Sequence, residues 1–173
     1  MDTVQIRDFL NRHKYAKKYF LGVFPSDGLP REVGFERPRT LVFNTDPHDE
    51  VGTHWAAMFL DVDKVTVFDS LAEFPDHSIY TQPIFKYVKK AAARVEYNKI
   101  QVQDSLSITC GEHCIYFISK MSEGLTFRNF LNLYSPDLVN NDGIVVKYVK
   151  ENSKPSSNHL ETEYTVCQKC KTV

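Results

Sequence analysis

The chain has 173 residues, 42% of them hydrophobic and 13% aromatic, which suits one globular domain with a single core. The same composition argues against a disordered or fibrous protein. Because 21 basic residues nearly balance 22 acidic ones, the net charge of -1 provides no general attraction to nucleic acid or to anionic membranes.

Membrane and secretion signals are absent from the sequence pattern. No apolar run approaches the roughly 20 residues that a spanning helix needs, and residues 1–10 lack the apolar segment of a secretory signal. We therefore expect an intracellular protein with no membrane partner. The composition changes clearly only after about Lys150, where the chain becomes polar. We predict one domain over residues 1–150, followed by a polar tail over residues 151–173.

The first half of the chain is predicted to contain a helix and then strands. Residues 3–11 favour a short opening helix, and the stretch 19–39 is broken repeatedly by Gly and Pro, which predicts mostly loop. Three short runs rich in β-branched and aromatic residues follow, which predicts an antiparallel sheet. These runs are 40–44, 53–61 and 64–70, the last two joined as a hairpin.

The second half is predicted to be mainly helical. Apolar residues at helical spacing over 81–98 predict a helix packed on the sheet, and the alternation over 99–103 predicts a further strand. From Cys110 the apolar residues again recur at helical spacing, which predicts a largely buried helix that ends at Gly124. Two further short helices are expected to begin near Thr126 and Ser135. The whole pattern predicts an α+β fold with a central, mostly antiparallel sheet packed by helices.

Cys110 stands where a loop meets the predicted buried helix. A cysteine reacts as its thiolate, and the unpaired N–H groups at a helix N-terminus lower the pKa of a thiol. Gly111 follows, and its lack of a side chain lets a ligand approach the backbone. Cys110 is therefore a candidate nucleophile, although a small residue at a helix start would explain it equally. Cys114, one turn later on the apolar stripe, is predicted to lie in the core.

His54 and Asp69 could complete a nucleophilic site. His54 follows a turn at Gly52 in a predicted strand, so its side chain could emerge at the end of the sheet. Asp69 ends the next strand of the hairpin. Together they could supply a general base and the group that orients it. Taken singly, such a histidine is more often structural, and an Asp at a strand end is usually a turn former.

Gln103 is a candidate for stabilising an oxyanion. Its side-chain amide, together with the backbone N–H of Cys110, could donate hydrogen bonds to a tetrahedral intermediate, and the alternative is a solvated side chain. His113 lies three residues after Cys110. From the same helix it could scarcely act as the general base, so we expect it on the helix surface.

The four cysteines offer an alternative from another class of protein. Cys110 with Cys114 and Cys167 with Cys170 form two close pairs, a poor layout for a disulfide framework. Four thiolates could instead hold a tetrahedral zinc ion in a non-enzymatic binding module. The second pair has the spacing of half a zinc knuckle, whereas the first has a non-standard spacing within an apolar helix.

Three stretches of the chain resemble adenovirus-type cysteine proteases, the adenain family, whose clan includes the SUMO-specific proteases. Residues 19–30 resemble the Tyr-Phe-Leu-Gly segment of the family, and residues 42–70 resemble its Asn-Thr, Gly-x-His-Trp and acidic strand-end pattern. Residues 102–114 resemble its block of Gln, six intervening residues and Cys-Gly. The resemblance runs from about residue 19 to residue 150. Each dipeptide is weak alone, but all of them in this order and spacing are a strong signal.

The resemblance implies a fold of the adenain and ubiquitin-like-protease type, with the nucleophile at the N-terminus of a buried helix. Carried over by position, Cys110 would be the nucleophile and Gln103 the oxyanion-hole donor. His54 would be the general base, and Asp69 would orient it where adenovirus enzymes often have Glu. Trp55 would pack beside the imidazole.

The activity implied by the resemblance is that of a cysteine endopeptidase, acting through a Cys-His-Asp triad and a thioester acyl-enzyme. The family tends to accept small residues, especially Gly, next to the scissile bond. Its substrates would be polypeptides, namely virus-like structural precursors, or ubiquitin-like conjugates if the protein is a deubiquitinase or SUMO-type isopeptidase. A viral or mobile-element origin would place it, as a monomer, in the host nucleus or cytoplasm and inside virions.

One departure from the family concerns activators. Adenovirus enzymes are stimulated by DNA and by a peptide cofactor that is disulfide-bonded to a cysteine between base and nucleophile. No cysteine lies between His54 and Cys110 in this chain, and its near-neutral charge weakens the case for DNA. We therefore expect no required cofactor and no metal, with nucleic-acid binding left open.

Overall fold

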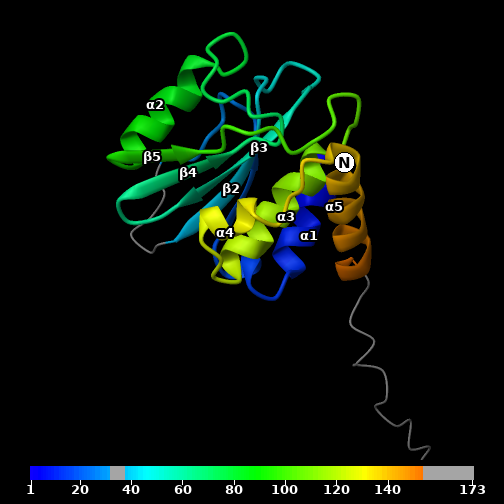
Figure 1. Ribbon diagram of the computed structural model, residues 1–173. Helices are drawn as coiled ribbons and strands as arrows, with labels where there is room; N and C mark the ends of the chain where they lie inside the picture. The colour runs from blue at the N-terminus through cyan, green and yellow to red at the C-terminus, as the bar shows by residue number, and fades with distance from the viewer. Residues whose placement is uncertain (32–37, 154–173) are drawn as a thin grey trace, which may run out of the picture.

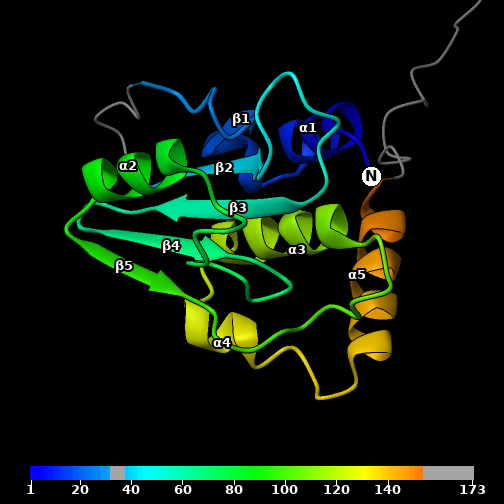
Figure 2. The ribbon, with the colours of Figure 1, turned by 90° about the horizontal axis from the view of Figure 1, so that it is seen from above.

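The computed structural model describes residues 1–31 and 38–153 and shows a sheet with helices on both faces (Figures 1 and 2). In chain order the elements are α1 (Thr3–Arg12), η1 (Ala16–Lys18), β1 (Phe20–Phe24), β2 (Arg39–Asn44), β3 (Trp55–Leu60), β4 (Lys64–Phe68), α2 (Gln82–Ala91), β5 (Arg94–Tyr97), α3 (Cys110–Ser122), α4 (Phe127–Leu131) and α5 (Leu138–Asn152). The α+β class predicted from the sequence is confirmed.

The sheet has five strands in the order β1-β2-β3-β4-β5. The two central pairs, β2 with β3 and β3 with β4, are antiparallel, whereas the outer pairs, β1 with β2 and β4 with β5, are parallel. The sheet is therefore mixed rather than mostly antiparallel. Parallel neighbours need a long crossover connection, and α2 supplies it between β4 and β5.

Alternation along the central strands produces two cores, one on each face of the sheet. In β2, Leu41 and Phe43 face the core that α2 covers, and Val42 between them faces the core that α3 covers. Figure 1 shows α2 on one side of the sheet and α3, α4 and α5 on the other. The α3 side is the larger core and holds most of the aromatic contacts, among them Phe68 stacked on Phe117 at 4.9 Å.

Helix α3 is the central helix of the larger core. Ten of its residues are buried, and it packs between the sheet, α1 and α5. The apolar residues on nearly every side of α3 suit this position, as predicted. The helix ends before Gly124, whose φ of 100° is a conformation that favours glycine.

Several predicted boundaries are confirmed. The opening helix corresponds to α1, and the hairpin between β3 and β4 is closed by a hydrogen bond from the N–H of Asp61 to the carbonyl of Lys64, 2.8 Å. Thr126 caps α4 by accepting from the N–H of Asn129. Helix α5 begins slightly later than expected, because Asp137 rather than Ser135 is its N-cap.

The predictions at the two sheet edges are wrong. Residues 81–98 do not form one helix, because α2 ends at Ala91 and residues 94–97 form β5, while 99–103 is a loop. Val95 continued the apolar stripe of α2 by coincidence, and it is 43% exposed on the edge strand. A strand such as β5 is defined by its pairing with β4, which no local period reveals.

The prediction that residues 19–39 are mostly loop is wrong at Phe20–Phe24, which form strand β1. It contains Gly22, at which the register with β2 shifts, and Pro25 follows directly after its last residue. Each of its residues is only partly buried, so the strand carries no alternating pattern. Gly and Pro, which punctuate loops, here mark an irregular edge strand.

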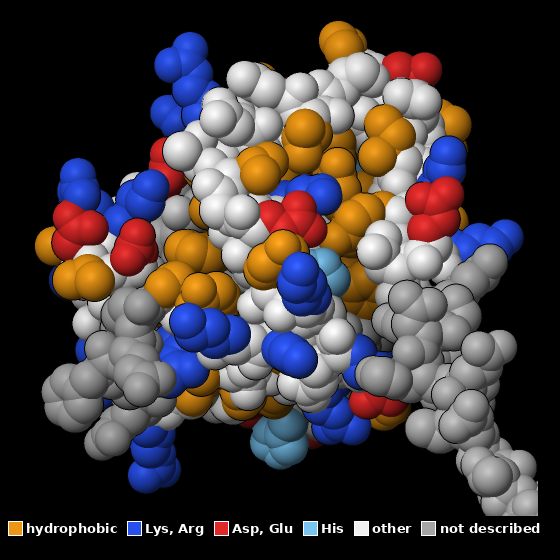
Figure 3. Space-filling view, turned by 90° about the horizontal axis from the view of Figure 1, so that it is seen from below, with side chains coloured by type: hydrophobic (Ala, Val, Ile, Leu, Met, Phe, Trp, Pro, Cys, Tyr) orange, Lys and Arg blue, Asp and Glu red, His pale blue; other side chains and the backbone are white. Residues whose placement is uncertain are grey.

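None of the described helices is long and apolar enough to cross a bilayer. On the face drawn in Figure 3, Lys and Arg side chains lie among acidic and hydrophobic ones. That face therefore presents no uniform charge. The predicted polar tail falls almost wholly outside the described residues, with α5 running to Asn152.

Candidate active site

Three of the predicted site residues meet at one end of the sheet. His54 directly precedes β3 and Asp69 directly follows β4. Because these strands are antiparallel neighbours, the start of one and the end of the other lie at the same edge. Cys110 is the first residue of α3, which packs on β3.

The imidazole of His54 is bonded to both partners. Its Nε2 lies 2.7 Å from Oδ1 of Asp69, and both residues are buried. The side chain also hydrogen-bonds the thiol of Cys110. Because Nε2 is engaged with the carboxylate, Nδ1 is the nitrogen left to exchange a proton with sulfur.

The carboxylate of Asp69 is held by a full set of donors. Besides the imidazole, Oδ1 accepts from the N–H of Leu71 at 2.9 Å. Oδ2 accepts from the N–H groups of Glu73 (2.9 Å) and Phe74 (3.2 Å) and from the hydroxyl of Tyr80 (2.7 Å). Burial opposes ionisation, but these bonds and the imidazole keep the pKa of Asp69 below its ordinary value. Asp69 is therefore a fixed anion behind the histidine.

The pKa values of His54 and Cys110 are shifted in opposite directions, that of His54 upward and that of Cys110 downward. Burial by itself lowers the pKa of His54, but hydrogen bonds and charge interactions with Asp69 and Cys110 raise it to about 10. Burial by itself raises the pKa of Cys110, but the imidazole and the backbone N–H groups of Trp55 and Gly111 lower it below its ordinary value. The shifts favour a thiolate–imidazolium pair, the reactive form of a cysteine nucleophile.

Gln103 is buried, and its side-chain amide is fixed at both ends. Its Oε1 accepts from the hydroxyl of Ser70 at 2.6 Å, and its Nε2 donates to the carbonyl of Ser107 at 3.1 Å. The carbonyl of Ser70 also accepts from the N–H of Gln103 at 3.1 Å. The Nε2 amide of Gln103 has a second hydrogen that it can donate. The N–H of Cys110 is at the first position of α3, where a backbone N–H has no hydrogen-bond acceptor within the helix.

The two supporting residues join the site to the start of the chain. The indole N–H of Trp55 donates to the carbonyl of Met1 at 3.2 Å. A Cβ on Gly111 would lie 2.9 Å from Cβ of Met1 and 3.3 Å from Ile6, so close packing of α1 requires the glycine. The expectation that the missing side chain of Gly111 makes room for a ligand is therefore wrong, because Met1 and Ile6 occupy that space. The packing of Trp55 against the imidazole stays a prediction.

The prediction that His113 lies on the helix surface is wrong. It is fully buried, with Nε2 2.7 Å from Oδ1 of Asp142 and Nδ1 3.0 Å from the hydroxyl of Tyr134. Helical spacing places His113 on α3 but does not reveal that α5 supplies a carboxylate opposite it. Cys114 is fully buried, as predicted, and burial raises the pKa of its thiol well above the ordinary value.

Sequence reasoning missed the residues that hold Asp69 and Gln103 in place. They are Ser70, Tyr80 and Asn98. Asn98 accepts from the N–H of Asp69 at 3.0 Å. Its position just after β5 was hidden by the wrong assignment of residues 81–98, whereas the adjacency of Ser70 to Asp69 was a signal that could have been used.

Among the described residues, His54, Asp69 and Glu73 could bring ligand atoms together. Both oxygens of Asp69 already accept protein hydrogen bonds, so a metal there would have to replace them. Cys167 and Cys170 lie outside the described residues, so the four-thiolate zinc site stays untested.

A cleft of about 330 Å³ lies at the start of β3. Its lining includes Gly52, two residues before His54, and Trp55, the residue after it. Val23, Phe24 and Val51 contribute apolar surface, and the acidic side chains Asp46 and Glu50 contribute polar surface. The cleft has room for an extended segment of polypeptide.

A mixed sheet with a thiol at the N-terminus of its buried helix, facing a histidine–carboxylate pair, defines the cysteine-protease fold of the ubiquitin-like-protease type. No protein-family model matches the chain. It is 31% identical over 140 residues to the "Protease" of Bovine adenovirus 4, across 71% of this chain and 69% of that protein. The chain belongs to the adenovirus protease family.

Solved structures agree on the fold. The ASFV pS273R protease superposes with a TM-score of 0.57 at 17% identity, covering 84% of this chain and 66% of its own. The central domain of the uncharacterized Lpg1148 protein from Legionella pneumophila superposes with a TM-score of 0.52 at 12% identity, covering 88% and 95%. The chain thus spans about two thirds of the Bovine adenovirus 4 protease and of the ASFV pS273R protease.

Proposed function

We propose that the protein is a cysteine endopeptidase whose nucleophile is Cys110, with His54 as its acid and base and Asp69 as the orienting anion. The observation that carries the proposal is the buried imidazole, bonded at 2.7 Å to Asp69 and hydrogen-bonded to the Cys110 thiol at a helix N-terminus. Membership of the adenovirus protease family supports it.

The proposed reaction is acyl transfer to sulfur and then to water. The Cys110 thiolate attacks the carbonyl carbon, and the C=O electron pair moves to oxygen, where Gln103 Nε2 and the N–H of Cys110 donate to it. When the intermediate collapses, the C–N bond breaks and His54 gives its proton to the leaving amine. Neutral His54 then takes a proton from the water that attacks the thioester. Collapse releases the acid and restores the ion pair.

The proposed substrates are polypeptide precursors of virus-like structural proteins, cut next to small residues such as Gly. The cleft lined by Gly52 and Trp55, with apolar Val23, Phe24 and Val51, offers a surface for apolar residues of such a substrate. The preference for Gly rests on the family resemblance alone. Cleavage of ubiquitin-like conjugates by the same three residues is the alternative that the test below separates.

Two variants test the chemistry. With fluorogenic peptides that contain Gly at the scissile bond, we expect Cys110→Ala to abolish turnover and the fast reaction of one thiol with iodoacetamide. Cys114→Ala is the matched control, because it removes a buried thiol one turn away and should keep both activities. Full turnover by Cys110→Ala would refute the proposal.

Two further measurements separate the alternatives, and a third tests for an activator. A ubiquitin-like vinyl sulfone that labels Cys110 faster than the peptides are cleaved would favour a deubiquitinase or SUMO-type isopeptidase. Metal analysis of the full chain tests the zinc module, which requires one zinc per chain released on mutating Cys110. Turnover that is unchanged by added DNA or basic peptide would agree with the expected absence of an activator.

A further inference from the structure

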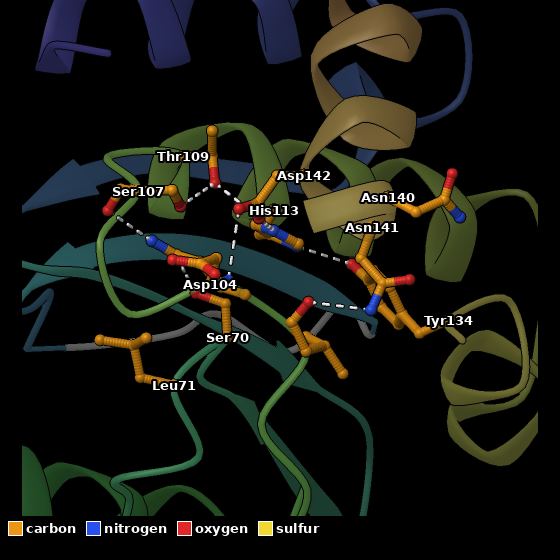
Figure 4. A network of polar contacts seen from close by, with 12 residues as sticks. Ser70, Leu71, Asp104, Ser107, Thr109, His113, Tyr134, Asn140, Asn141 and Asp142 are labelled. Carbon is orange, nitrogen blue, oxygen red and sulfur yellow. Dashed lines mark hydrogen bonds and ion pairs between the residues drawn. The ribbon is translucent and has the colours of Figure 1, made fainter. Parts of the chain in front are cut away.

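A second buried histidine–carboxylate pair lies next to the site and takes no part in the proposed reaction (Figure 4). Nε2 of His113 lies 2.7 Å from Oδ1 of Asp142, and Nδ1 lies 3.0 Å from the hydroxyl of Tyr134. Burial lowers the pKa of His113 and raises that of Tyr134, so a neutral imidazole donates from Nε2 and accepts the Tyr134 proton at Nδ1. Both nitrogens are occupied, and His113 cannot serve as a general base.

The other partners of Asp142 lie in the segment that joins Gln103 to Cys110. Oδ1 accepts from the hydroxyl of Thr109 at 2.9 Å, and Oδ2 accepts from the N–H of Asp104 at 3.3 Å. Thr109 is the residue before Cys110, and Asp104 is the residue after Gln103. One carboxylate therefore reaches both ends of the segment.

The middle and the beginning of the segment are tied down as well. The hydroxyls of Ser107 and Thr109 lie 2.9 Å apart, and the carbonyl of Ser107 accepts from the Gln103 amide. Asn141, the neighbour of Asp142 on α5, donates to the carbonyl of Val102 at 3.0 Å. Figure 4 shows these groups converging between the loop and the first turns of α3 and α5.

Burying a carboxylate lowers the stability of the fold unless its hydrogen bonds are satisfied. Well-packed apolar residues in its place often give a fold that is equally stable or more stable. A satisfied polar network instead specifies one conformation, because any shift of the loop leaves a buried group unpaired. Here the conformation specified is that of residues 103–110, which place the two proposed oxyanion donors relative to each other.

We propose that Asp142 and His113 are positioning residues that hold the Gln103 amide and the Cys110 N–H in the geometry that an oxyanion requires. The inference rests on the proposed function. It assigns α5 a direct part in the site, since the Asp142 carboxylate bridges the loop and α3, and His113 orients that carboxylate from the first turn of α3.

The test compares two reactions of the same thiol. Peptide hydrolysis passes through an oxyanion, whereas alkylation by iodoacetamide displaces iodide at a CH₂ carbon and forms none. We expect Asp142→Ala to lower kcat by about 100-fold, the scale of a misplacement of about 1 Å, with the alkylation rate unchanged. Asp142→Asn should fall between Asp142→Ala and wild type, and it serves if Asp142→Ala does not fold. Asn140→Ala, an exposed neighbour on α5, is the matched control and should keep both rates.

A mutant cycle with Gln103→Ala decides whether Asp142 acts through Gln103. In that background Asp142→Ala should cost little further kcat, because the group that it positions is already gone. A full second loss, an alkylation rate that falls in step with kcat, or an unchanged kcat would each overturn the inference. If the wild type shows no Cys110-dependent turnover, the proposed function itself fails. If it shows turnover and the Asp142 variants keep it, only the positioning role fails.

Discussion

Replacing Asp69 by Asn removes the anion behind His54 and keeps the size of the side chain. The pKa of His54 is raised from 6.5 to about 10, through Asp69 and Cys110 together. That change corresponds to about 5 kcal/mol in favour of the imidazolium. An opposite charge in contact accounts for about 1 to 3 pH units of such a change, so Asp69→Asn should lower the pKa of His54 by at least one unit.

The assay is the pH dependence of kcat/KM on a peptide substrate. Activity requires the imidazolium, so its alkaline limb should lie near pH 10 in the wild type, where His54 loses its proton. In Asp69→Asn the limb should move to lower pH by at least about one unit. Asp76→Asn, an exposed acid on the same loop, is the control and should leave the limb in place. An alkaline limb that Asp69→Asn does not move would refute the assignment of Asp69.

The same pair makes a signed prediction about stability. The raised pKa of His54 stabilises the fold below pH 6.5, and this contribution is lost as the pH rises through about 10. The lowered pKa of Cys110 has the opposite sign, since its contribution is present above the ordinary thiol value of 9.0 and is lost as the pH falls through the folded value. The folded and unfolded states each hold one proton on the two groups from pH 6.5 or the folded pKa of Cys110, whichever is higher, up to about pH 9. The pair should add no pH dependence to urea unfolding in that range. Above about pH 9 stability should fall.

Three further substitutions test the surroundings of the site. Gly111→Ala places a Cβ 2.9 Å from Met1 and should destabilise the fold by about 1 to 3 kcal/mol, and an unchanged midpoint of thermal unfolding would contradict the packing. Ser70→Ala removes the 2.6 Å bond to the Gln103 carbonyl oxygen and should lower kcat about 10-fold, because it removes one of two anchors of an oxyanion donor. Steady-state kinetics check this, and a change in KM alone would count against it. Phe117→Ala empties the fully buried position stacked on Phe68 and should cost about 3 to 5 kcal/mol in urea unfolding. A loss below about 1 kcal/mol would mean that the core around α3 repacks freely.

The parts of the fold predicted best are those whose residues carry their own period or punctuation. Helix α1, the hairpin of β3 and β4, and helix α3 with its end at Gly124 all follow from local patterns. The edges were predicted poorly for a matching reason. Strand β5 depends on β4 for its hydrogen bonds, and the apolar Val95 suits a helix or a strand equally.

The candidate site, too, was predictable only in those features that are local in the sequence. The order and spacing of His54, Asp69, Gln103 and Cys110 in the sequence were enough to nominate the four residues and to indicate their family. They could not show that Asp69 is saturated with donors or that Ser70 orients the Gln103 amide. Those contacts join separate segments, so no spacing along the chain reports them.

His113 marks the limit most clearly. By itself the sequence determined that this histidine lies on α3 one turn from Cys110, since apolar periodicity and helix-ending signals are local properties. Only the tertiary structure decided that it is buried against Asp142, because the N-terminal turns of α5, about 30 residues later, fold back onto α3. Whether a polar residue faces water or a partner is set by what the fold places opposite it, and that depends on the packing of the whole core.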